Sequence, residues 1–115
     1  LNDRMSKILD ELAELLKLRK TASSEESYVA SLHAQGINKI LEKIGEEATE
    51  TIIAAKEYDA NVDDSSGAVI HETADLWFHT MVMLSHLDLE PSKVLEELEK
   101  RFNISGLEEK ASRQD

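Results

Sequence analysis

The sequence predicts an all-α fold: a bundle of the four-helix type that a second copy of the chain completes. One proline and four glycines in 115 residues leave few positions for turns. Aromatic residues make up 4% of the chain, which is few for a β-sandwich. Apolar residues make up 41% and recur in segments at steps of three and four residues, the spacing of one helix face. We expect a single domain over residues 1–115, of which 103–115 are a charged tail.

Residues 3–20 form the first predicted helix, because their apolar residues make one stripe along a helix. The stripe consists of Met5, Ile8, Leu9, Leu12, Leu15 and Leu16. A polar stretch, residues 21–27, follows it. Its last residue, Ser27, is suited to cap a short helical turn from Tyr28 to Gln35, and Gly36 is expected to end that turn.

Residues 37–58 and 68–88 form the two long predicted helices, and a loop from Asp59 to Gly67 joins them. The loop offers four candidate N-caps: Asp63, Asp64, Ser65 and Ser66. Gly45 lies inside the first of these helices, where a glycine costs roughly 1 kcal/mol relative to alanine. Its presence there predicts close packing or the close approach of a ligand.

The helix over 68–88 is apolar on nearly every side, and such a helix is typically buried on every side. Its apolar residues are Val69, Ile70, Leu76, Trp77, Phe78, Met81, Val82, Met83, Leu84 and Leu87. The chain's other helices scarcely suffice to cover it, so we expect a homodimer or a larger homo-oligomer. Pro91 suits the first position of a last helix that runs to about Phe102.

The charge balance excludes several classes of partner. Asp and Glu number 24 against 13 Lys and Arg, and the net charge of −11 argues against nucleic acid and anionic membranes. The absence of cysteine excludes a disulfide scaffold, a cysteine zinc finger and a thiol nucleophile. The first residues are unlike a signal peptide, and no apolar run is long enough for a membrane span. We therefore expect a cytoplasmic protein, trimmed or part of a longer one because it does not begin with Met.

The two long helices carry acids at spacings that place them on shared faces. At about 100° per residue, Glu47 and Glu50 lie about 60° apart, and so do Glu72 and Asp75. Four carboxylates brought together repel one another, so such a cluster predicts a cation between them. Clustered oxygen ligands favour Mg²⁺, with Mn²⁺ as an alternative. Glu46 lies almost opposite the apolar stripe of its helix, so a solvated face is the alternative for it.

Acids inside the most apolar helix are costly unless they are paired, so Glu72 and Asp75 favour a functional role. His79 lies on the same face, four residues after Asp75. It is a candidate for a substrate contact or a partner of the carboxylates, and a core histidine with one hydrogen bond is the alternative. His71 and Glu72 begin a pattern like the zinc-protease HExxH, but the second histidine is missing. A ferritin-like di-iron site is also excluded, since no histidine has a glutamate three residues before it.

The charged tail carries two cations, Lys110 and Arg113, three residues apart with Ser112 beside them. In a strongly acidic chain, this group fits a phosphate contact. Ser105 and Glu108 have the spacing of a capping box, which predicts that a short helix starts there. We hypothesise that this segment folds over the site that binds the phosphates. The alternative is a frayed terminus.

Four segments together carry a resemblance to a known family. They are Ser27–Leu32, Lys39–Glu50, the Glu72-x-x-Asp75-Leu76 pattern and Ser105–Arg113. The acidic pattern resembles the all-α nucleoside triphosphate pyrophosphatase superfamily that includes MazG. With the tail, the sequence resembles the phosphoribosyl-ATP pyrophosphatase family, and the resemblance covers nearly the whole chain. The loop from Asp59 to Gly67 looks longer than the family's usual link.

The resemblance implies a dimeric helical bundle that uses Mg²⁺ to cleave phosphoribosyl-ATP into phosphoribosyl-AMP and pyrophosphate, the second step of histidine biosynthesis. It implies the metal ligands Glu47, Glu50, Glu72 and Asp75. Glu46 and Glu47 are the candidate catalytic residues, with Glu46 orienting or deprotonating water. The candidate substrate contacts are Lys43, His79, Lys110, Ser112 and Arg113.

Two other functions remain open from the sequence. One is a house-cleaning pyrophosphatase of the same superfamily, which would act on ordinary or damaged nucleotides. The other is a non-enzymatic helical assembly protein, in which the acids would form a solvated face. The tail segment favours the phosphoribosyl-ATP enzyme over the first, and burial of Glu72 and Asp75 would argue against the second.

Overall fold

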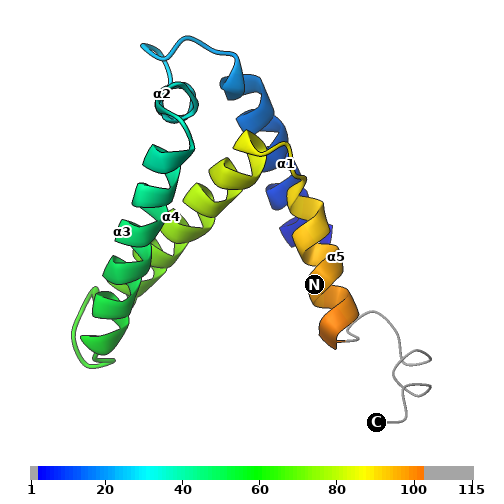
Figure 1. The fold of residues 1–115 in the computed structure, drawn as a ribbon. Coiled ribbons are helices and arrows are strands. Elements are labelled where there is room, and N and C mark those ends of the chain that lie inside the picture. The colour runs from blue at the N-terminus through cyan, green and yellow to red at the C-terminus, as the bar shows by residue number, and fades with distance from the viewer. Residues whose placement is uncertain (1–2, 103–115) are drawn as a thin grey trace, which may run out of the picture.

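The computed structural model describes residues 3–102, which fold into helices alone (Figure 1). In chain order these are α1 (Asp3–Lys20), α2 (Tyr28–Gln35), α3 (Ile37–Lys56), α4 (Ser65–His86) and α5 (Pro91–Phe102). The predicted all-α fold is therefore confirmed for this part of the chain. No helix of residues 3–102 combines the length and the apolar character needed to cross a lipid bilayer.

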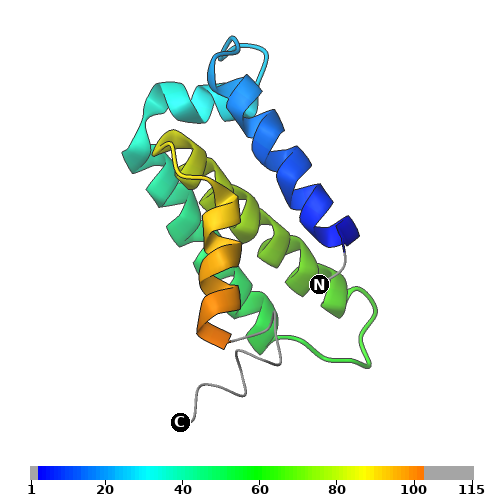
Figure 2. The same cartoon turned by 90° about the vertical axis from the view of Figure 1, so that its right-hand side faces the viewer.

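The helices are arranged as a V (Figures 1 and 2). α3 and α4 pack along each other in the most extensive contact between helices and form one arm. α1 and α5 contact each other and form the other arm, while α2 crosses the apex where the arms meet. The molecule measures 53 × 41 × 26 Å along its principal axes. The arms therefore share little surface away from the apex.

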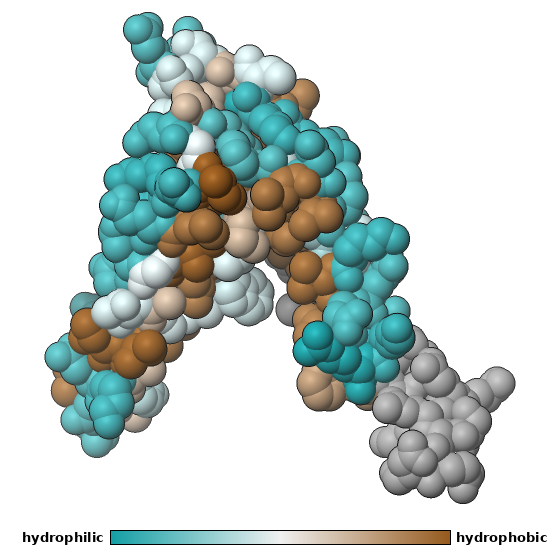
Figure 3. Space-filling view, in the orientation of Figure 1, coloured by the Kyte–Doolittle hydropathy of each residue, from teal (hydrophilic) through white to brown (hydrophobic). Residues whose placement is uncertain are grey.

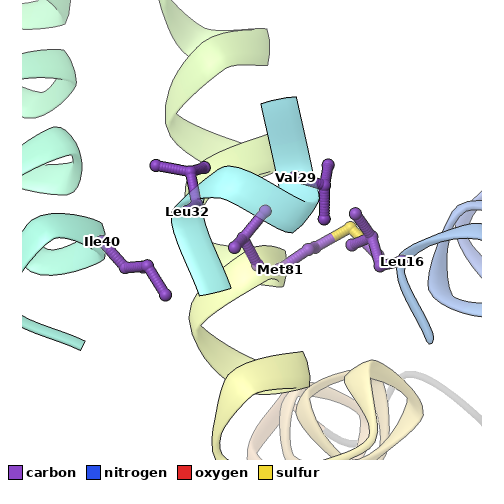
Figure 4. Close-up of a cluster of buried hydrophobic side chains, with 6 residues drawn as sticks. Leu16, Val29, Leu32, Ile40 and Met81 are labelled. Carbon is purple, nitrogen blue, oxygen red and sulfur yellow. The ribbon is translucent and has the colours of Figure 1, made fainter. Parts of the chain in front are cut away.

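The buried core sits at the apex, around α2 (Figure 4). It draws side chains from four helices, and its buried members are Leu16, Val29, Leu32, Ile40, Met81 and Val82. The short helix supplies two of them, so it acts as a wedge that holds α1, α3 and α4 together. Burial of these apolar side chains is the main stabilising contribution to the fold.

Local signals set both ends of α2 as predicted. The Ser27 hydroxyl accepts a hydrogen bond from the Ala30 backbone N–H at 3.2 Å, so the predicted N-cap is confirmed. Gly36 ends the helix with φ 98°, a backbone conformation that favours glycine, and its N–H donates to the Leu32 carbonyl at 3.0 Å. The chain can therefore turn sharply from α2 into α3.

The loop between the two long helices covers residues 57–64, two to three residues earlier than the predicted 59–67. α3 ends at Lys56, and α4 begins at Ser65 rather than at residue 68. Asp64 adopts a left-handed conformation with φ 68°, and the Ser65 hydroxyl accepts a hydrogen bond from the Asp59 N–H at 2.8 Å. This bond closes the loop early and lets Gly67 join the first turn of α4.

The joint between α4 and α5 is held by charged groups. Asp88 adopts a left-handed conformation with φ 59°. The Lys20 ammonium donates to the Ser85 carbonyl and pairs with the Asp88 carboxylate, both at 2.7 Å. Lys17 pairs with Glu90 at 2.9 Å. α1 is thereby tied to the turn that precedes α5, and this joint contributes to the angle of the V.

The prediction that the helix over 68–88 is buried on every side is wrong for a single chain. Met81 and Val82 face the apex core, but Ile70 is 68% exposed and Trp77 is 61% exposed. Figure 3 shows apolar surface on the inner sides of the V. A groove there is lined almost entirely by apolar side chains of α1, α4 and α5, among them Leu9, Trp77, Met83, Leu84, Val94 and Leu98.

Candidate active site

The five acids singled out by the sequence lie on α3 and α4, the helices of one arm (Figures 1 and 2). Carboxylate oxygens of Glu47, Glu50 and Glu72 lie within 4.8 Å of one another. The structure therefore brings together three of the four residues expected to hold a metal. Their convergence follows from the three-residue step on α3 and the packing of α4 against that face.

Glu47 is the buried member of this carboxylate cluster, with 7% of its surface exposed. Burial raises the pKa of its carboxyl group, and the charges of Asp75 and Glu50 and a hydrogen bond with Glu72 raise it further. With its pKa raised, Glu47 keeps its proton to a higher pH than an ordinary glutamate. A cation and that proton therefore compete for the same oxygens.

Asp75 lies beside the cluster but outside the set of three. Its charge contributes to the raised pKa of Glu47, which puts it on the same side of α4. Its carboxylate is 3.2 Å from the His71 imidazole, one helical turn earlier. The His-x-x-x-Asp spacing could have indicated this pair, and it explains the histidine that begins the HExxH-like pattern.

Glu46 points to solvent and forms an ion pair with Lys43 at 3.3 Å. The two residues sit one turn apart on α3, and the Glu46 carboxylate raises the pKa of Lys43, which stays a cation. An exposed carboxylate and an ammonium group thus stand next to the buried cluster. The expected roles of Glu46 as a base and of Lys43 as a phosphate contact stay predictions.

Gly45 does not mark close packing within the chain. A Cβ atom built there meets no atom within 4 Å among the described residues. Gly45 instead lines a shallow hollow with Glu46, Thr49 and Glu50. Of the two expectations for this glycine, packing inside the chain is wrong, and the approach of a ligand stays a prediction.

His79 is buried, with 5% of its surface exposed. Its Nδ1 faces the Asp75 backbone carbonyl at 3.0 Å, and its Nε2 faces the Tyr28 hydroxyl at 2.9 Å. Both ring nitrogens are engaged inside the protein, which favours a core histidine over a substrate contact. Tyr28 was missed by sequence reasoning, because no local signal joins it to a residue 51 positions away.

The remaining candidates, Lys110, Ser112 and Arg113, lie outside the described residues, as does the capping box at Ser105. Their role as phosphate contacts stays a prediction.

A protein-family model described as phosphoribosyl-ATP pyrophosphohydrolase matches residues 9–102, which is most of the chain. The match spans all five acids and runs from α1 to the end of α5. The enzymes of this description are hydrolases that act on a pyrophosphate bond. This helical chain, with its carboxylate cluster between α3 and α4, belongs to the phosphoribosyl-ATP pyrophosphohydrolase family.

Proposed function

We propose that this chain hydrolyses phosphoribosyl-ATP to phosphoribosyl-AMP and pyrophosphate with Mg²⁺, as the second step of histidine biosynthesis. The observation that carries the proposal is the convergence of the Glu47, Glu50 and Glu72 carboxylates in a member of this family. A set made only of carboxylate oxygens suits a hard divalent cation, and Mn²⁺ is the natural substitute for Mg²⁺.

Glu47, Glu50 and Glu72 would hold the cation, and Asp75 is the fourth proposed ligand. When bound, the cation would neutralise the triphosphate and stabilise the leaving pyrophosphate. The fit rests on the donor set itself. A buried carboxyl with a raised pKa, surrounded by three more acids, is costly unless a positive charge offsets it.

The chain's other groups would position and deprotonate the attacking water. Glu46 is exposed at the edge of the cluster, where its carboxylate can accept a proton from water. Lys43 pairs with Glu46 and can turn to a phosphate oxygen of the substrate. Lys110, Ser112 and Arg113 are proposed as further phosphate contacts.

We also propose that the protein works as a homodimer. Ile70 and Trp77 on α4 are more than half exposed. Trp77 lines the apolar groove between the arms, and Ile70 lines a separate hollow with Ala55 and Tyr58. A soluble enzyme rarely leaves so much apolar surface in water. A second copy that fills the V would bury it, and α4 would then be covered on the sides that the chain itself leaves open.

The alternatives differ in what they make of the carboxylate cluster. Glu72 and Asp75, whose burial would argue against a non-enzymatic assembly protein, are half-buried. Such a protein would also have no reason to bury Glu47 among other acids, which disfavours this alternative. A house-cleaning pyrophosphatase could use the same cluster on other nucleotides. The base and sugar of the substrate therefore decide between the two enzymes.

The decisive experiment measures pyrophosphate release from phosphoribosyl-ATP with Mg²⁺ and with a chelator. We expect release only with the metal, and much slower release from ATP, dCTP and dUTP. Equal rates on the ordinary nucleotides would favour the house-cleaning enzyme. Absence of release from every nucleotide, by folded protein with Mg²⁺, would refute both.

A further inference from the structure

Tyr28 and His79 form a connection between α2 and α4 whose direction can be assigned. The Asp75 backbone carbonyl can only accept a hydrogen bond, so His79 Nδ1, 3.0 Å away, carries the hydrogen. In the neutral ring Nε2 is then an acceptor, and the Tyr28 hydroxyl donates to it at 2.9 Å. The only hydrogen of the phenol group is therefore directed at the buried histidine.

This hydrogen bond fixes the hydroxyl of Tyr28, while much of the residue stays exposed to solvent. His79 is 5% exposed, whereas Tyr28 is 51% exposed. Half of the surface of Tyr28 is thus open to solvent while its hydroxyl is bonded to a buried group. Phe78 stacks on this ring with centroids 6.4 Å apart and 21° between the planes. His79 meets it edge-on at 5.9 Å. The ring is thus held rigidly and remains partly free.

The held ring lies next to the candidate active site. His79 bonds to the carbonyl of Asp75, the residue whose carboxylate stands beside the acidic cluster. Lys43 and Glu47 are near enough for their charges to act on the Tyr28 hydroxyl. A phosphate group bound by Lys43 would therefore lie beside an exposed aromatic ring.

We propose that Tyr28 is a substrate-contacting residue whose ring stacks on the purine base of the nucleotide, and that His79 is the positioning residue that orients it. Any nucleobase has a flat face that an aromatic ring can cover, and such stacking tolerates different bases. A ring locked in place loses little freedom when the base binds. The inference rests on the proposed function, because it takes the substrate to be a nucleotide.

The test separates the base from the phosphates. We expect Tyr28→Leu to raise KM for phosphoribosyl-ATP by about 10-fold or more, with kcat changed by less than about 3-fold. Inhibition by pyrophosphate, which has no base, should keep its wild-type constant. Tyr58→Leu is the matched control, because Tyr58 is the only other tyrosine, is equally exposed and lies beyond the end of α3. A wild-type KM in Tyr28→Leu, or equal weakening of pyrophosphate inhibition, would overturn the stacking role.

A double-mutant cycle tests the positioning role of His79. We expect Tyr28→Phe and His79→Leu each to raise KM by about 2- to 5-fold, because each breaks the same hydrogen bond. The double variant should be no worse than the worse single variant, since a phenylalanine needs no partner. Independent, multiplying effects would refute the connection. A lost helical circular dichroism signal would show that Tyr28→Leu fails to fold. In that case the double-mutant cycle alone tests the inference. Wild-type kinetics in both Tyr28→Phe and His79→Leu would then overturn the inference. Wild-type protein that fails to release pyrophosphate would refute the proposed function and the substrate named here.

Discussion

The apex and the α3–α4 arm of this protein are built on opposite plans. At the apex, apolar side chains from four helices meet around α2 and leave almost no surface to water. In the arm, the carboxylates of Glu47, Glu50 and Glu72 crowd together while the apolar side chains of Ile52 and Ile70 face outward. The apex is packed within one chain, whereas the arm carries the acids proposed to hold a cation and the apolar surface proposed to bind a second copy. The main apolar core therefore lies at the apex, whereas the acidic cluster lies in the arm.

The largest effect is expected from removing one carboxylate of the cluster in the arm while the apex core is left unchanged. Glu72→Gln should reduce pyrophosphate release by about 100-fold or more, because it removes a ligand of the proposed cation. The same change relieves repulsion in the metal-free cluster, so Tm measured in chelator should stay equal or rise. Glu99→Gln, on the exposed surface of α5, is the control and should keep activity. Activity that survives in Glu72→Gln would remove this residue from the site.

The next effect contrasts two isoleucines of the same helix. Ile40→Ala in the apex, where the side chain is fully buried, should lower the free energy of unfolding by about 2–5 kcal/mol. Ile52→Ala in the arm, where 63% of the residue is exposed, should lower it by about 0.5 kcal/mol or less in dilute protein. Urea titrations on a dilution series measure both. Equal losses would show that the arm is packed as tightly as the apex.

Assembly sharpens the comparison further. Sedimentation of the wild-type protein should give about twice the chain mass of 12.9 kDa at micromolar concentration. Trp77→Glu places a charge on the apolar face of α4 and should shift the population to the single chain. Trp77→Phe keeps an aromatic ring there and should remain dimeric. A wild-type species of 12.9 kDa alone would show that the exposed apolar surface has another purpose.

The smallest effect concerns pH at the apex. His33 and His86 bring their Nδ1 atoms to 2.9 Å, and burial first, then the charges of His86 and Lys20, lower the pKa of His33 below 6.5. The unfolded chain then takes up this proton before the folded chain does. The contribution to stability is therefore complete above pH 6.5 and declines as the pH falls through the window below it. His33→Gln should flatten that part of the stability curve, and an unchanged slope would assign it to other groups.

Local signals predicted most of the fold. The cap at Ser27, the stop at Gly36 and the start at Pro91 depend on neighbouring residues alone, and each was predicted from the sequence. The start of α4 was missed because it depends on the left-handed backbone of Asp64 and on a hydrogen bond from Asp59 to Ser65. Such a bond closes a loop across six residues and leaves no periodic pattern.

The candidate site divides in the same way. Helical spacing predicted that Glu47 and Glu50 share a face and that Glu72 lies opposite, and these carboxylates do lie together. The spacing of Asp75 on α4 allowed it to join the cluster or to pair with His71 one turn earlier, and spacing alone does not decide between the two. The hydrogen bond between Tyr28 and His79 joins α2 to α4 across 51 residues, so it depends on the tertiary packing and has no local sequence signal.

The joint between α4 and α5 makes the angle between the two arms sensitive to the salt concentration. Its ties between α1 and the turn before α5 are made by Lys17 and Lys20 near the surface, whereas the core is held by apolar contact. At high ionic strength, salt screens these ion pairs over a few ångströms but leaves the apolar contacts of the core in place. The angle between the arms can therefore relax at high ionic strength while the chain stays folded. The carboxylate cluster between α3 and α4 can thus keep its geometry while the angle between the arms adjusts to the salt concentration.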